Sequence, residues 1–141
     1  MIYVDASVIV AALTPEENTT RAYAWLTERP RGSLGFSGWV VTEVSSALAR
    51  KVRIGTLSGG ERDRILHDWR HLRTDSFISL PVPVGAFEEA ARLIDYPRSV
   101  LRAGDALHLA IASLGGHGLA TFDAQLAEAA TRAGVPVSRI E

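Results

Sequence analysis

The chain has 141 residues and a mass of 15.2 kDa, which predicts one domain spanning residues 1–141. Its 47% hydrophobic and 22% charged residues exclude an intrinsically disordered chain, and its apolar runs are too short to cross a bilayer. The absence of cysteine excludes disulfides, zinc ribbons, iron–sulfur clusters and thiol catalysis. We therefore expect a cytoplasmic protein that does not contact the membrane.

The hydrophobic pattern alternates short apolar runs with helical segments, which predicts an α/β domain. Its centre is expected to be a mostly parallel sheet of about five short strands flanked by helices. The predicted strands are residues 2–4, 34–37, 77–80, 119–122 and 135–140. The predicted helices are residues 7–13, 19–27, 39–51, 58 to about 72, 86–94, 103–114 and 125–133. Ser58 and Glu61 have the spacing of a capping box at the start of the fourth helix.

Two acidic residues follow predicted strands, and two more belong to predicted helices. Asp5 and Asp123 end the strands at residues 2–4 and 119–122, at the edge where open α/β sheets bind ligands. Asp105 begins a helix within an apolar stretch, and Glu43 lies inside another. Each Asp taken alone could simply cap a helix. Four such acids in one small chain favour a cluster.

Four segments carry a resemblance to a known family. They are Val4-Asp5-Ala6-Ser7, the stretch from Ser37 to Glu43, Leu101-Arg102-Ala103-Gly104-Asp105-Ala106-Leu107-His108-Leu109-Ala110, and Ala120-Thr121-Phe122-Asp123. Their order and spacing resemble the PIN-domain ribonucleases of the VapC toxin type over nearly the whole chain. The resemblance implies a PIN-like fold and a metal-dependent endoribonuclease that is the toxin of a toxin–antitoxin pair. It also implies a homodimer and a small VapB-like antitoxin.

The resemblance further implies that Asp5, Glu43, Asp105 and Asp123 converge on Mg²⁺, or on Mn²⁺. Carboxylates and water suit such hard ions, whereas zinc or copper prefers nitrogen and sulfur. The ion would activate a water that attacks the RNA phosphorus, leaving a 5′-phosphate and a 3′-hydroxyl.

The net charge of −1 and the pI of about 6.4 do not indicate a general polyanion binder. With the four acids set aside, however, twelve acids face fifteen bases, a net charge of +3. All the bases but Lys51 are arginine, which suits phosphate contacts and surface ion pairs alike.

Four other residues are candidates for the periphery of this site. Ser7 and Thr121 lie two residues from Asp5 and Asp123 and are expected to donate hydrogen bonds there, unless they are ordinary turn residues. His108 lies one turn after Asp105 and either touches substrate, bonds the acid, or is a core histidine with satisfied hydrogen bonds. Arg102 either holds a phosphate or stays at the surface.

Two further features have competing interpretations. His67 and His71 have the i, i+4 spacing of a zinc-protease pair, but both lie off the apolar side of their helix and no third ligand is evident. This predicts a helix that faces solvent or a protein partner. Aromatic residues offer a surface for an antitoxin or belong to the core: Tyr23, Trp25, Trp39 and Trp69.

Two other classes of function remain open. A metal-dependent phosphatase or phosphoacceptor domain would also use Asp5 at a strand end, but Ser7 stands where a second Asp would be needed. A non-catalytic module that binds RNA or protein would not need acids at all four positions. Cleavage of RNA distinguishes the first interpretation from the other two.

Overall fold

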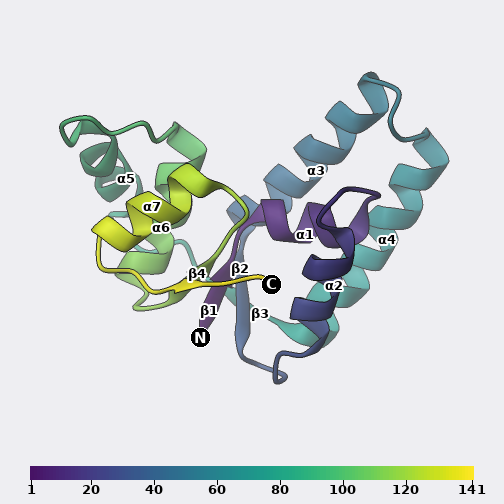
Figure 1. The fold of residues 1–141 in the computed structure, drawn as a ribbon, viewed down its shortest axis with the longest axis horizontal. Helices are drawn as coiled ribbons and strands as arrows, with labels where there is room; N and C mark the ends of the chain where they lie inside the picture. The colour runs from purple at the N-terminus through teal and green to yellow at the C-terminus, as the bar shows by residue number, and fades with distance from the viewer.

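A parallel five-stranded sheet lies at the centre of the computed structural model, which describes residues 1–141 (Figure 1). The strands, in chain order, are β1 (Ile2–Val4), β2 (Leu34–Ser37), β3 (Phe77–Leu80), β4 (Gly118–Ala120) and β5 (Val137–Ser138). Their order in the sheet is β3-β2-β1-β4-β5, and every neighbouring pair is parallel. The first strand of the chain is therefore the central strand of the sheet.

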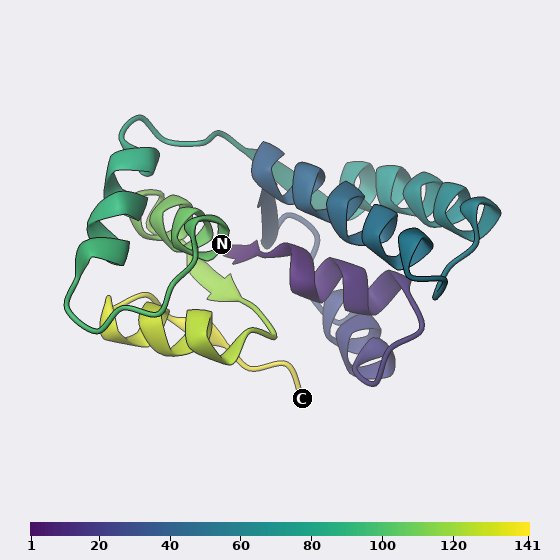
Figure 2. The same cartoon turned by 90° about the horizontal axis from the view of Figure 1, so that it is seen from above.

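Helices cover both sides of this sheet. They are α1 (Ala6–Leu13), α2 (Thr19–Thr27), α3 (Gly38–Arg53), α4 (Gly59–Ser76), α5 (Ala86–Asp95), α6 (Ala103–Leu114) and α7 (Ala124–Arg132). Helices α1 to α4 lie on one side and α5 to α7 on the other, and the long α3–α4 pair extends away from the sheet (Figures 1 and 2). None of the helices combines the length and the apolar composition that crossing a membrane requires.

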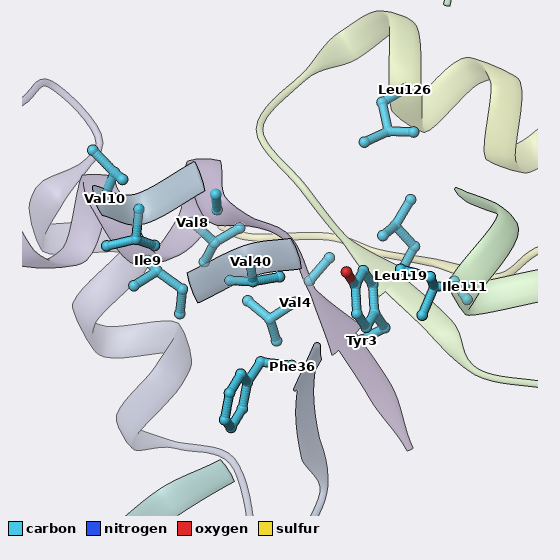
Figure 3. Packing of buried hydrophobic residues seen from close by; sticks show 14 of the residues in the cluster. Tyr3, Val4, Val8, Ile9, Val10, Phe36, Val40, Ile111, Leu119 and Leu126 are labelled. Carbon is cyan, nitrogen blue, oxygen red and sulfur yellow. The ribbon is translucent and has the colours of Figure 1, made fainter. Parts of the chain in front are cut away.

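The core forms on both faces of β1, because a central parallel strand covered by helices is buried on both sides. Tyr3 and Val4 are fully buried and point in opposite directions. Figure 3 shows Val4 beside Phe36 and Val40, and Tyr3 on the side of Ile111.

The predicted elements are nearly all confirmed, and the differences occur at their ends. The strand predicted at residues 119–122 ends at Ala120, because side-chain hydrogen bonds hold the following residues in a turn. The strand predicted at residues 135–140 pairs only at Val137–Ser138. Helix α4 continues to Ser76, four residues beyond the predicted end.

The capping box is confirmed: Glu61 N donates to Ser58 Oγ at 3.1 Å, and Ser58 N donates to Glu61 Oε2 at 2.7 Å.

The aromatic residues divide between core and surface. Trp25 and Trp69 are buried, and Trp69 makes edge contacts with Phe36 and Phe77 at centroid distances of 5.7 and 5.8 Å. These two tryptophans therefore stabilise the core and offer no surface to a partner. Tyr23 is exposed and Trp39 is half-buried.

Candidate active site

The order of the strands places two of the acids at one edge of the sheet. From β1 the sheet continues through β2 and β3 on one side, and the chain then returns to form β4 on the other side. Such a reversal leaves a crevice at the carboxyl ends of the two strands concerned. Asp5 directly follows β1, and Asp123 follows β4 after two residues. Each of them caps the helix that comes next.

Asp5 is buried and tightly hydrogen-bonded. Its side chain is 4% exposed, and its Oδ1 accepts from Ser7 N at 2.9 Å, Ser7 Oγ at 2.5 Å and Val8 N at 3.4 Å. Its Oδ2 accepts from Thr121 Oγ1 at 2.5 Å. Burial raises the pKa of Asp5, whereas His108 and these hydrogen bonds lower it. The carboxylate is therefore fixed in one orientation.

The same two hydroxyls shape the turn before α7. Ser7 Oγ accepts from Phe122 N at 2.9 Å, and Thr121 Oγ1 accepts from Asp123 N at 2.9 Å. Asp123 Oδ1 accepts in turn from Leu126 N at 2.9 Å. Ser7 and Thr121 thus connect the two strand ends, and both donate to Asp5.

Asp105 is the least constrained of the four acids. It is the third residue of α6, whose N-cap is Arg102, and its carboxylate accepts no hydrogen bond from the protein, so the helix-cap interpretation is wrong for this residue. Burial, followed by the negative charges of Asp123, Glu43 and Asp5, raises the pKa of Asp105, and His108 opposes this effect. Asp105 is therefore the acid on which the charges of the other three act.

Glu43 reaches the site from α3 through a buried chain of hydrogen bonds. Its Oε2 bonds Nε2 of His108, whose Nδ1 lies 2.8 Å from the hydroxyl of Tyr3. The Tyr3 hydroxyl lies 2.8 Å from Ser37 Oγ. His108 is therefore a core histidine with both nitrogens satisfied, and it contacts Glu43. Burial raises the pKa of Tyr3, which keeps its hydroxyl protonated.

The sequence interpretation missed Tyr3 and Ser37. A tyrosine inside a fully buried strand needs a hydrogen-bond partner for its hydroxyl, which was the available signal.

The donor set fits a hard divalent cation in its chemistry. All four candidate ligands are carboxylates, and Asp105 accepts no hydrogen bond from the protein. No group of three or more Asp, Glu or His side chains is gathered closely enough to hold a metal ion. A cation would therefore have to draw the carboxylates together.

The remaining basic side chains form no ion pair with the four acids. Arg102 is exposed at the N-cap of α6 and forms no ion pair. His67 and His71 are exposed on α4, with ring centroids 4.5 Å apart. Lys51, in α3, forms an ion pair with Glu16 in the loop between α1 and α2, with Nζ and Oε1 2.7 Å apart.

The double change of His67 and His71 to alanine is expected to leave RNA turnover within about twofold of wild type, because exposed helix positions tolerate substitution. Steady-state cleavage of a short RNA, with circular dichroism as the folding control, measures this. A large loss of turnover in a folded double variant would show that α4 takes part in the site.

Comparisons with known proteins agree with this fold. The family model described as the PIN domain matches residues 2–132. No curated protein matches the sequence.

Three solved structures illustrate the likeness. A chain of the FitAcB structure from Neisseria gonorrhoeae is 24% identical, with a TM-score of 0.72, over 99% of this chain and 97% of that chain. The toxin VapC20 from Mycobacterium tuberculosis, described as a Sarcin-Ricin loop cleaving toxin, is 18% identical, with a TM-score of 0.72, over 92% of this chain and 95% of that chain. A toxin–antitoxin complex from Klebsiella pneumoniae contains a chain 18% identical, with a TM-score of 0.67, over 100% and 98%. At these identities the structures show the fold, and the family match covers nearly the whole chain. The chain therefore belongs to the PIN-domain family.

Proposed function

We propose that this protein is a metal-dependent endoribonuclease that acts as the toxin of a toxin–antitoxin pair. The observation that carries the proposal is the position of Asp105, which accepts no hydrogen bond from the protein and whose pKa is raised by burial and by the charges of Asp123, Glu43 and Asp5 from three other segments. Such an arrangement is costly to hold unless a cation compensates it. Membership of the PIN-domain family and the all-oxygen donor set support a nuclease site.

The chain's own residues have distinct roles in this proposal. Asp5 and Asp105 hold Mg²⁺ or Mn²⁺ most directly, and Glu43 and Asp123 complete the negative site. When bound, the ion supplies polarisation of the scissile phosphate and an activated water. Ser7 and Thr121 keep the Asp5 carboxylate in a single orientation, which limits the reorganisation needed when RNA binds.

The partners proposed here follow from the relatives. VapC20 is named as a toxin, and the structure from Klebsiella pneumoniae is named as a toxin–antitoxin complex. We propose by this likeness that a VapB-like antitoxin binds the present chain and that the chain forms a homodimer. Size-exclusion chromatography with light scattering is expected to give twice the 15.2 kDa chain mass. A monomer at micromolar concentration would contradict the homodimer.

The central test is incubation of the purified protein with total RNA, with Mg²⁺ or with EDTA, followed by mapping of the new 5′ ends. We expect defined cleavage sites with 5′-phosphates in Mg²⁺ and none in EDTA. A parallel assay uses a small aryl phosphomonoester. Hydrolysis of that ester without RNA cleavage would indicate the phosphatase alternative, and RNA binding without either reaction would indicate a non-catalytic module.

A further inference from the structure

We propose that Tyr3 and Gly104 are positioning residues that hold the Glu43 carboxylate beside Asp105. This inference rests on the proposed function, because it concerns the geometry of the same acidic site. Neither residue is a candidate ligand, and each acts on a different oxygen of Glu43.

The first oxygen, Oε2, is held through His108. An ionised carboxylate only accepts, so Nε2 of His108 carries the proton between them. Nδ1 of His108 is held in turn by the Tyr3 hydroxyl at 2.8 Å. Tyr3 and His108 are 0% and 2% exposed, so no water replaces this contact. The hydroxyl of Tyr3 therefore fixes the ring that orients Glu43.

The second oxygen, Oε1, occupies space that only glycine leaves free. A Cβ atom on Gly104 would lie 2.8 Å from Glu43 Oε1 and 3.4 Å from Cζ2 of Trp39. Gly104 has no positive φ, so its backbone does not require glycine. Glycine is also a poor helix former, and it lies here in the first turn of α6. A side chain at this position would therefore displace the Glu43 carboxylate rather than strain the backbone.

The two residues of α6 that contact Glu43 lie on either side of Asp105, about one helical turn apart. Gly104 directly precedes Asp105, and His108 follows it by three residues. Both hold Glu43, which comes from α3 on the other side of β1. One helical turn therefore sets the separation of two acids that the sequence places far apart.

The test compares two substitutions with matched controls. Gly104→Ala is compared with Gly60→Ala, because Gly60 is also the second residue of its helix and has open space around it. Tyr3→Phe, which removes only the hydroxyl, is compared with Tyr96→Phe at an exposed position. The measurements are Mn²⁺ affinity by calorimetry, kcat and KM for a short RNA, the ¹⁵N shifts of the His108 ring, and thermal unfolding.

We expect Gly104→Ala to weaken Mn²⁺ affinity and to lower kcat by roughly 10- to 100-fold, as for other residues that orient metal ligands. KM should change little, and the melting temperature should not fall. Tyr3→Phe should give a loss of the same order and shift the Nδ1 resonance of His108. Both control variants should match wild type in every measurement.

Two outcomes would overturn the proposal. One is wild-type Mn²⁺ affinity and kcat in Gly104→Ala. The other is an additive effect of Gly104→Ala on top of Glu43→Gln, because a residue that acts through Glu43 adds nothing once Glu43 is changed. If Tyr3→Phe fails to fold, the measurements on Gly104→Ala still test the proposal. A wild-type protein that cleaves no RNA would contradict the proposed function, and the Mn²⁺ and ¹⁵N measurements would still decide the role of Tyr3 and Gly104.

Discussion

Asp105→Asn is expected to reduce kcat/KM for RNA by roughly 100-fold or more, the loss typical when one preorganised charged group is removed from an active site. An amide binds a hard divalent ion far more weakly than a carboxylate does. The Asp105 side chain accepts no protein hydrogen bond, so the substitution removes charge without breaking a structural contact. Asp105 is a sharper test than Asp5, whose oxygens hold Ser7, Val8 and Thr121 in place.

The matched control is Asp75→Asn, an exposed Asp on α4. It should retain wild-type kcat/KM, and both variants should give the wild-type circular dichroism spectrum. RNA cleavage that continues undiminished in Asp105→Asn or in EDTA would contradict a metal-dependent site. Such a result would indicate a route through the RNA 2′-hydroxyl.

The four acids could be selected from the sequence because their positions depend on local patterns. Asp5 follows a short apolar strand, Asp105 interrupts an apolar helix, and the order of the four segments matched a known family. The helices were predictable for the same reason, since their apolar periodicity and the Ser58 capping box are local signals.

The contacts among these residues could not be predicted in this way. The Tyr3–His108–Glu43 chain joins β1, α6 and α3, and Tyr3 and His108 are 105 residues apart in the sequence. The turn at Thr121 was read as strand because its hydrophobic pattern continues to Phe122. One of the hydrogen bonds that hold this turn runs from Phe122 N to Ser7 Oγ, 115 residues away in the sequence. Side-chain partners that are distant in sequence leave no periodic signal.

The metal-free protein is expected to gain stability from Asp105→Asn at neutral pH. Burial and three neighbouring carboxylates raise the pKa of Asp105 above its unfolded value of 3.8, so the native state binds its proton more tightly than the unfolded state does. The ionised Asp105 therefore lowers the free energy of unfolding most at pH values above its folded-state pKa. This loss of stability is relieved as the pH falls through the folded-state pKa toward 3.8. The variant has no such penalty at any pH. Its free energy of unfolding should therefore exceed that of the wild type most at neutral pH, and the difference should shrink as the solution is acidified.

Added metal should also stabilise the wild type, because the bound ion compensates the same negative charges that Asp105→Asn reduces. At a free concentration about 100 times the dissociation constant, one ion bound only to the native state adds roughly 2.7 kcal/mol. Thermal unfolding with and without MnCl₂, at neutral and acidic pH, measures both effects. The gain from Mn²⁺ should be much smaller in Asp105→Asn. No shift with metal, or a metal-free variant less stable than wild type, would contradict a repulsive four-acid cluster.

The central position of β1 also determines when the site can exist during synthesis. Strand β1 is synthesised before both of its neighbours: it pairs on one side with β2, but its other partner, β4, begins only at Gly118. Asp5 likewise waits for the hydroxyl of Thr121, 116 residues later. Domains fold as units once their distant contacts are available. A nascent chain therefore carries Asp5 well before the pocket around it can assemble, because β4 and Thr121 are still to be made. A PIN domain built this way has no finished acidic site until β4 and the turn after it have been translated.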